Sequence, residues 1–335
     1  MNNTPVSKFL TMTASPHIKS PIKTKNIMLD VIIALMPALF WSIYVFGPRS
    51  LVLTFISVIS CVVFEFIFRK LVKKPNSIAD LSAVVTGILL AFSLPVSVPL
   101  WIPAVGAFFA IVIVKQLYGG IGKNIVNPAL AARVFLFIAY PGELVAFTKP
   151  FEYLPAFKIS VEVNEKIIAG ATPLAILKNG NIPSDNNIAC LLGNISGCIG
   201  EISATLLLLG GIYLLIRKVI TWHIPICYIA TVAVISFIFP TGDMSGLSFM
   251  TYQLFSGGLI IGAFFMATDY VTSPVTPKGR IIFGVGCGLI TLFIRYFGGY
   301  PEGVSFAILI MNLFVWYLDK GTKPVSFGGA KNAKK

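Results

Sequence analysis

Residues 27–46 read IMLDVIIALMPALFWSIYVF, a run of twenty residues with one charged side chain, Asp30. A helix of this length and hydropathy is long enough to cross the hydrocarbon core of a bilayer. The preceding residues, 1–26, are polar and basic and carry no evident cleavage pattern of a signal peptide. The run therefore predicts a retained first membrane span.

The composition of the rest of the chain agrees with a membrane protein. Of the 335 residues, 56% are hydrophobic and 12% charged, and the mean hydropathy is +0.86. Soluble domains do not reach these values, whereas polytopic membrane proteins do. The formal net charge of +13 would suggest nucleic acid in a soluble protein. Here the basic residues lie between apolar runs, as they do in the loops of membrane proteins. The charge therefore favours membrane lipid as a partner, and no nucleic acid is expected.

Apolar runs predict an all-α polytopic fold with about ten transmembrane helices. The fifth run is short, begins at Asn127-Pro128 and contains Arg133, so a broken or tilted helix is expected there. The predicted spans lie near residues 27–46, 50–68, 78–95, 99–117, 127–141, 197–216, 222–239, 250–268, 281–297 and 302–318.

The spans predict five segments of the chain. Residues 1–26 form a cytoplasmic N-terminal segment and residues 27–141 a first membrane half. Residues 142–196 form the one long polar segment between apolar runs. Residues 197–318 form a second membrane half, and residues 319–335 a basic cytoplasmic tail.

Weak internal similarity relates the two membrane halves. Residues 86–92 resemble residues 257–263, and residues 115–120 resemble residues 294–299. The copies are separated by about five spans, an odd number, so the second must cross the membrane in the opposite sense. This pattern predicts two inverted repeats of five helices, an arrangement that places binding sites between the repeats.

Positive charge predicts the orientation of the chain. With the termini inside, 18 of the 26 Lys and Arg residues fall on the cytoplasmic side and five on the other. Cytoplasmic loops of membrane proteins are enriched in these residues. Both termini are therefore expected in the cytoplasm, and residues 142–196 on the extracytoplasmic side.

The chain offers few metal ligands. Its five cysteines form no C-x-x-C pair and no ferredoxin-type run, and it has two histidines. We therefore predict no metal site. Cys190 and Cys198 flank the end of the polar segment, where a disulfide or shared ligation is the less favoured alternative to two free thiols.

A glycine-rich turn precedes the fifth span. Residues 119–124 read GGIGKN, and Asn127 follows. Backbone N–H groups near Gly122 and Asn124, together with Lys123, could hold an anionic or flavin group. The alternative is a tight cytoplasmic turn before a helix that begins at Pro128, and the motif taken alone favours it.

A second motif, GATPL at residues 170–174, lies inside the long polar segment. Thr172 has no base beside it in sequence, and an unaided threonine is a poor nucleophile. Covalent chemistry at Thr172 would need a separate modifying enzyme. From spacing alone, an ordinary loop threonine before Pro173 is the favoured interpretation, and no catalytic residue is predicted.

Ionisable residues within or beside the spans are costly unless they face a partner or a cavity. Each can belong to an ion or proton relay or to a structural pair, and structure is slightly favoured for any single one. These residues are Asp30, Glu65, Arg133, Glu201 and Arg295.

The chain resembles the RnfD/NqrB family of membrane subunits over nearly its whole length, and the Rnf branch more closely. Several long motifs in the same order carry the resemblance, which makes it far more specific than any single motif. They are residues 15–18, 28–35, 119–128, 170–174, 193–203, 264–274 and 298–304.

The resemblance implies FMN attached through its phosphate to a threonine by a phosphodiester bond, which a flavin transferase forms from FAD. The family threonine matches Thr172, and Gly170, Ala171 and Pro173 belong to the same motif. The family usually has Asp six residues before the threonine and Ser or Thr three before it. This chain has Lys166 and Ala169 instead.

The resemblance also implies a function in the cell (inner) membrane. The chain would be an electron-transfer subunit of an ion-translocating ferredoxin:NAD⁺ oxidoreductase, the Rnf complex, in which electron flow drives Na⁺ or H⁺ transport. It would be one relay, incomplete as an enzyme alone, with membrane and peripheral iron–sulfur and flavin subunits as partners. The coupling ion and a second flavin such as riboflavin are left open. The alternative is a solute transporter or channel without a redox role.

Overall fold

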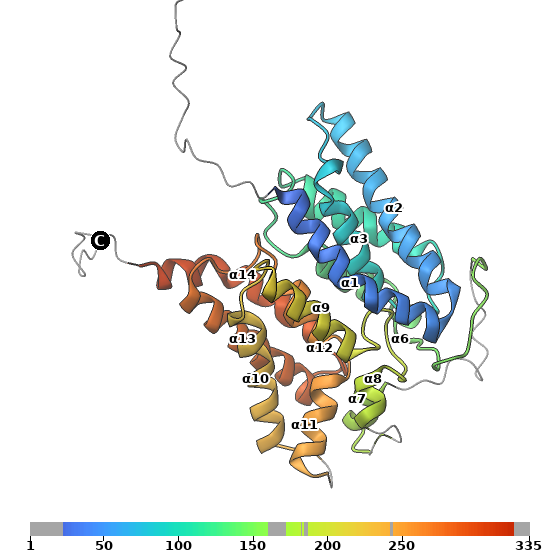
Figure 1. Cartoon of the computed structure of the whole chain (residues 1–335), viewed down its shortest axis with the longest axis vertical. Helices are drawn as coiled ribbons and strands as arrows, with labels where there is room; N and C mark the ends of the chain where they lie inside the picture. The colour runs from blue at the N-terminus through green and yellow to red at the C-terminus, as the bar shows by residue number, and fades with distance from the viewer. Residues whose placement is uncertain (1–22, 160–171, 182, 184–186, 242–243, 325–335) are drawn as a thin grey trace, which may run out of the picture.

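The computed structural model describes residues 23–159, 172–181, 183, 187–241 and 244–324, and all regular elements in these ranges are helical. Two groups of helices lie side by side (Figure 1). The first group is coloured blue to green and the second yellow to red, and two short yellow-green helices lie below the first group and beside the lower part of the second. Within the described ranges the fold is therefore all-α, as predicted from the sequence.

The first group contains the helices that follow the N-terminal segment. They are α1 (Thr24–Phe46), α2 (Pro48–Leu71), the 3₁₀ turn η1 (Ile78–Asp80), α3 (Ser82–Phe92), α4 (Ile102–Phe108) with its π-helical continuation η2 (Phe109–Gln116), α5 (Pro128–Ala139) and α6 (Pro141–Val145). Helix α2 packs against α3 and α4, and α5 packs against α4 and η2.

The second group follows two short helices, α7 (Pro173–Lys178) and α8 (Asn187–Leu192). Helix α13 lies between α10 and α14, and α10 also packs against α11. The helices of this group are α9 (Ala204–Ile216), α10 (His223–Ile238), α11 (Gly246–Phe255), α12 (Leu259–Ile261) with its π-helical continuation η3 (Gly262–Met266), α13 (Pro277–Phe297) and α14 (Val304–Thr322).

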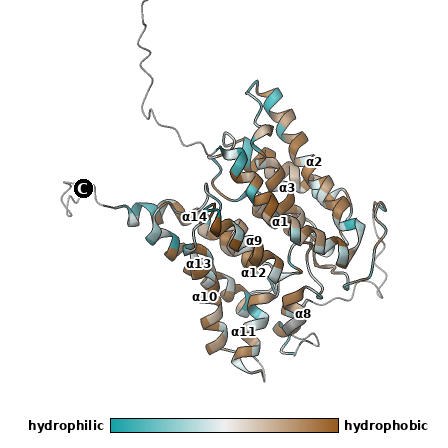
Figure 2. Cartoon of the chain, in the orientation of Figure 1, coloured by the Kyte–Doolittle hydropathy of each residue, from teal (hydrophilic) through white to brown (hydrophobic). Residues whose placement is uncertain are grey.

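Four of the described helices are long and apolar enough to cross a membrane: α1, α2, α13 and α14. A fifth span results if α11 and the helix Leu259–Met266, which meet at a bend of 62°, are counted together. Apolar residues cover most of the helical surface (Figure 2). Large apolar side chains such as Phe40 and Trp316 are exposed. An apolar surface of this kind is stable in contact with lipid chains. Together with the apolar helices, it indicates a multi-pass membrane protein.

Proline and capping residues define several helix starts. Pro128 and Pro173 occupy first-turn positions, where the missing N–H of proline costs no hydrogen bond. The Asn127 side chain accepts hydrogen bonds from the N–H groups of Ala129 and Leu130. Helix α5 is unbroken from Pro128 to Ala139, and the chain turns at Tyr140 before α6. The break that was one of the two expectations for this span is therefore absent from Pro128 to Ala139.

The two groups meet along α1 with α9 and along α5 with α14. A polar contact joins them where α5 begins, because Asn127 Nδ2 donates to the Met266 carbonyl at 3.1 Å. Met266 is the last residue of the π-helix η3, and a π-helix departs from the regular α-helical bonding pattern. The start of the fifth predicted span is therefore fixed by the opposite half of the chain.

Arg49 lies in the first turn of α2 and is fully buried. Its Nε donates to the Val96 carbonyl and its Nη2 to the Val98 carbonyl, both at 2.9 Å. Its Nη1 donates to the carbonyls of Pro155 and Lys158, both at 2.8 Å. The Arg49 guanidinium thus joins two connecting segments, residues 96–98 and residues 155–158, to the corner between α1 and α2.

Candidate functional site

Thr172 is the N-cap residue of α7. Its backbone is extended, with φ −64° and ψ 149°, and its Oγ1 accepts a hydrogen bond from the Ala175 N–H at 3.3 Å. The side chain is half-buried. No hydrogen bond donated by this hydroxyl is seen within the described ranges, so its proton is not needed to hold the helix. Gly170 and Ala171 lie outside the described residues.

Helix α7 is held against the connection between α13 and α14. Leu174 and Leu177 are buried on one face of α7. Lys178 Nζ donates to the Tyr300 carbonyl at 2.8 Å and also to the Gly298 carbonyl. Burial lowers the pKa of the Lys178 ammonium. Thr172 therefore caps a short helix that Lys178 anchors to the connection between α13 and α14.

Helix α7 also touches the break between α11 and α12. Gly257 at this break has φ +71°. A Cβ added there would lie 2.7 Å from both Leu174 Cδ1 and Glu302 Oε1. A glycine is required because both the conformation and the space exclude a side chain. The first turn of α7 thus lies within a few ångströms of the Glu302 carboxylate.

Glu302 is partly buried and belongs to a cluster of charged side chains. Arg133 on α5 forms an ion pair with Glu201 at 3.0 Å and a second ion pair with Glu302. The Gly258 N–H donates to Glu302 Oε1 at 2.7 Å. These groups come from α5, from the segment before α9 and from the segment before α14. The sequence singled out Arg133 and Glu201, but it did not reveal that they are paired, and it missed Glu302.

Arg295 lies close to this cluster but bonds to other groups. Its Nη1 donates to the Gln253 carbonyl at 2.6 Å and to Gln253 Oε1 at 2.8 Å. Its Nη2 would lie 3.5 Å from a Cβ added at Gly257. Arg295 therefore ties α13 to α11 beside the break.

A cavity of about 300 Å³ opens beside the Arg133–Glu302 pair. Phe137 on α5 and two aromatic residues near the start of α14, Tyr300 and Phe306, line it. The Phe137 and Tyr300 rings meet edge to face with centroids 4.8 Å apart. The cavity thus combines aromatic walls with one charged edge. We call it the aromatic cavity.

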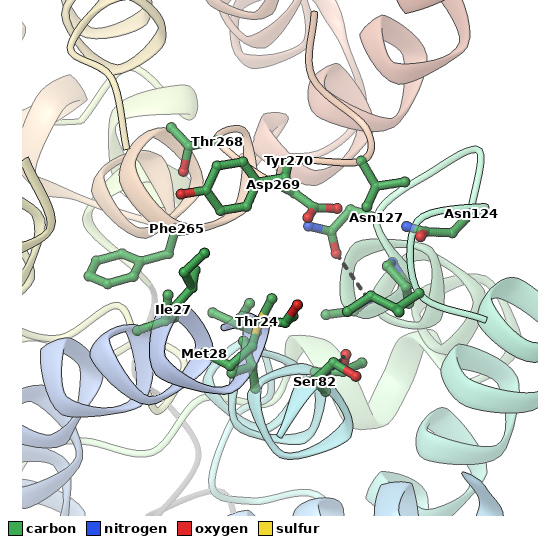
Figure 3. Close-up of a pocket in the computed structure, with 18 of the residues that line it drawn as sticks. Thr24, Ile27, Met28, Ser82, Asn124, Asn127, Phe265, Thr268, Asp269 and Tyr270 are labelled. Atoms are coloured by element: carbon green, nitrogen blue, oxygen red, sulfur yellow. Dashed lines mark hydrogen bonds between the residues drawn. The ribbon is translucent and has the colours of Figure 1, made fainter. Parts of the chain in front are cut away.

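A larger cavity of about 440 Å³ lies between the two helix groups, and we call it the interhalf cavity. Figure 3 shows Ile27 and Met28 of α1 on one side and Phe265 to Tyr270 on the other. The predicted residues Gly122, Asn124 and Asn127 line it. Lys123 does not belong to the lining residues.

Residues 119–124 form a tight turn before α5, which was the alternative interpretation of this glycine-rich motif. Gly119, Gly120 and Gly122 have φ values of +117°, +96° and +86°, which L side chains rarely adopt. The three glycines therefore form a tight turn before α5, and Gly122 also lines the interhalf cavity. The binding of an anionic or flavin group by this motif stays a prediction.

Lys115 is a lining residue of the interhalf cavity that sequence reasoning did not select. Its Nζ donates to Glu65 Oε2 at 2.8 Å and to Ser82 Oγ at 2.6 Å, and both charged side chains are buried. Lys115 and Glu65 are thus a structural pair. Asp30 is also paired, with the Tyr213 hydroxyl at 3.0 Å and Arg217 at 3.3 Å.

Cys190 and Cys198 are both buried, and no disulfide joins them. Arg133 Nη2 lies 3.8 Å from Cys198 Sγ, and Ser256 Oγ lies 3.6 Å from Cys190 Sγ. Among the described residues, no group of three or more His, Cys, Asp or Glu could hold a metal ion.

Comparison with known proteins identifies the family. A profile of the NQR2, RnfD, RnfE family matches residues 11–328. The chain belongs to this family. The match includes both cavities, α7 and the Arg133 cluster, so the sites described above lie inside the family domain.

Full-length relatives agree with this assignment. The chain is 46% identical to the D subunit of the Na⁺-translocating ferredoxin:NAD⁺ oxidoreductase complex of Acetobacterium woodii, over 97% of each chain. It is 40% identical to the proton-translocating counterpart of Clostridium ljungdahlii, over 95% of this chain and 96% of the relative. It is 35% identical to the D subunit of an ion-translocating oxidoreductase complex of Halorhodospira halophila, over 95% of each chain.

Proposed function

We propose that the chain is the D subunit of an ion-translocating ferredoxin:NAD⁺ oxidoreductase complex and that it carries FMN on Thr172. The observation that carries the first part is the identity of 46% over nearly the whole chain to a relative of that name. As one subunit of a translocase, it works with the membrane and peripheral iron–sulfur and flavin subunits of the complex. The coupled ion is Na⁺ or H⁺, since the relatives include proteins named for each.

The surroundings of Thr172 fit a phosphodiester bond. The Thr172 hydroxyl accepts a hydrogen bond from Ala175, a role that an ester oxygen can keep in weaker form. It donates none within the described ranges, so esterification by a flavin transferase costs no donated bond there. FMN supplies the redox chemistry, and the protein supplies attachment, orientation and electrostatics.

The interhalf cavity is suited to a second, non-covalent flavin. Its volume of about 440 Å³ falls in the range of small-molecule sites, and Phe264 and Phe265 provide an apolar wall. Asn124 and Asn127 contribute polar groups. The one lysine of the wall, Lys115, is already engaged by Glu65 and Ser82. An uncharged flavin such as riboflavin suits this wall better than a phosphorylated one.

We further propose that the chain has ten spans in two inverted repeats. Five shorter apolar helices lie where further spans are predicted: Ser82–Phe92, Ile102–Gln116, Pro128–Ala139, Ala204–Ile216 and His223–Ile238. In the weak sequence repeat, residues 115–120 correspond to residues 294–299, so Gln116 at the end of η2 corresponds to Arg295 near the end of α13. Both termini are proposed to be cytoplasmic and Thr172 extracytoplasmic.

The covalent flavin is tested by replacing Thr172 with Val, which keeps the shape and removes the hydroxyl. In cells that express the transferase, the wild-type peptide containing residue 172 should gain the mass of FMN less one water. The denatured wild-type protein should fluoresce under ultraviolet light in a gel, and Thr172→Val should not. An unmodified wild-type peptide would contradict the proposal and favour a transporter without a redox role.

Thr172→Ser is the matched control. It keeps the hydroxyl, and Ser caps a helix about as well as Thr. We expect it to assemble like the wild type and to retain part of the flavin. Loss of assembly in Thr172→Val, together with normal assembly of a flavin-free Thr172→Ser, would show that the Thr172 hydroxyl acts through capping α7.

A further inference from the structure

The aromatic cavity and the helix that Thr172 caps share a wall. Pro301 lines the aromatic cavity and also a smaller cavity of about 90 Å³ that is lined by Leu174 and Leu177 of α7. Leu174 and the Glu302 carboxylate both approach the space above Gly257. The side chain of Leu174, two residues after Thr172, therefore lies close to the charged edge of the aromatic cavity.

The cavity has the chemistry of a site for a flat, mostly apolar ring with one polar edge. The rings of Tyr300 and Phe306 are nearly parallel, at 9°, with centroids 6.2 Å apart, and Phe137 stands edge-on to both. Aromatic walls of this kind bury large apolar area and favour stacked or edge-to-face contacts. Arg133 and Glu302 supply hydrogen-bonding groups on one side. By contrast, the 90 Å³ cavity is smaller than typical ligand pockets.

We propose that the aromatic cavity binds the isoalloxazine ring of the flavin attached to Thr172, and that the Arg133 cluster sets the reduction potential of that ring. This inference rests on the proposed attachment of FMN. It assigns Arg133, Glu201 and Glu302 as tuning residues, and Phe137, Tyr300 and Phe306 as the walls that hold the ring.

The cluster can tune a potential because its charged groups are largely shielded from water. The side chains of Arg133, Glu201 and Glu302 are 13%, 5% and 23% exposed. With Arg295 nearby, two positive groups face the two carboxylates of Glu201 and Glu302. Charges in such surroundings interact more strongly than charges in water. Removing one carboxylate charge leaves a net positive cluster, which stabilises the more negative, reduced ring.

The test is Glu201→Gln, which removes the charge and keeps an oxygen that can accept from Arg133. In the purified complex, we expect the midpoint potential of the covalent flavin to shift to a more positive value, with the flavin mass on the Thr172 peptide retained. Glu65→Gln is the control, because it neutralises the buried carboxylate of a different ion pair, towards the far end of α2 from α7 (Figure 1). Its covalent flavin should keep the wild-type potential.

A second variant tests the place of the ring without relying on charge. Ser305 lines the aromatic cavity and is buried. Ser305→Trp should fill the cavity and force the tethered ring into water, so the native complex should show stronger flavin fluorescence and faster quenching by iodide. Leu247→Trp is the control, because it adds the same side chain at an exposed position outside the cavity, and it should behave like the wild type in both measurements.

The outcomes separate this inference from the proposed function. A flavin-bearing Thr172 peptide with an unshifted potential in Glu201→Gln would overturn the inference and leave the proposed attachment standing. Unchanged fluorescence in an assembled, flavin-bearing Ser305→Trp complex would overturn it as well. A wild-type peptide without flavin would overturn both.

Discussion

At the scale of single residues, the buried charges are explained by their partners. Lys115 and Glu65 bond to each other, and Arg133 lies between Glu201 and Glu302. A charge in a membrane helix is tolerated when an opposite charge or a cavity receives it. The sequence predicted that Glu65, Arg133 and Glu201 need a partner or a cavity. It could not predict which ones, because each pair joins helices that are distant in the chain.

Breaking the Lys115–Glu65 pair should destabilise the protein strongly. Lys115→Met leaves the Glu65 carboxylate buried without its cation, for which we expect a loss of about 3–5 kcal/mol in the free energy of unfolding. Thermal denaturation of the protein in detergent checks this expectation. The double variant Lys115→Met with Glu65→Gln should recover much of the loss, since no unpaired charge remains. Equal destabilisation of the single and double variants would contradict the interpretation.

At the scale of elements, the break between α11 and α12 was not evident from the sequence. Residues 250–268 were predicted as one span, but the structure bends by 62° between α11 and Leu259–Met266. The signal was present in Gly257-Gly258. Glycine pairs are common in membrane helices, however, and only the contacts of Leu174 and Glu302 show why a side chain is excluded here.

Gly257→Ala should disrupt this break. The new Cβ would meet Leu174 and Glu302 at 2.7 Å in a left-handed conformation, so we expect a loss of more than about 1 kcal/mol in stability. Thermal denaturation in detergent and the extent of flavin attachment report the effect. Gly197→Ala is the matched control, because nothing lies within 4 Å of its added Cβ. Similar losses in both variants would argue against a special role for residue 257.

Lys178 connects α7 to the segment before α14. Lys178→Met removes the bonds to the Gly298 and Tyr300 carbonyls and should increase hydrogen exchange across α7. Lys178→Arg should retain most of the protection because it keeps the charge and donors. Unchanged exchange in Lys178→Met would show that Leu174 and Leu177 hold α7 without help.

At the scale of the whole molecule, composition and apolar runs predicted an all-α membrane protein, and the described helices agree. The interhalf cavity could be anticipated only in part. The glycine motif marked Gly122, Asn124 and Asn127, which share one wall. The opposite wall comes from α1 and from residues 264–271, and no local pattern relates these segments to the motif. Cavities between distant helices depend on tertiary packing, which one sequence does not display.

The orientation of the whole chain is testable with single cysteines. In a variant without native cysteines, a thiol at position 149 should react with an impermeant reagent in intact cells. A thiol at position 74 should react only after the membrane is opened. Lys149 and Lys74 are both exposed, so access to the reagent is governed by the membrane. The reverse pattern would overturn the orientation that the positive charges predict.

The corner formed by Arg49 has a consequence for the order of synthesis. Its guanidinium bonds to Val96 and Val98, and also to Pro155 and Lys158, which follow it by 106 and 109 residues. A chain leaves the ribosome from its N-terminus. The Arg49 guanidinium at the tip of the α1–α2 hairpin therefore lacks its acceptors at Pro155 and Lys158 until the helices from α3 to α6 have been synthesised. Closure of this corner is a late event in biogenesis, although the hairpin is the first part of the membrane domain to appear.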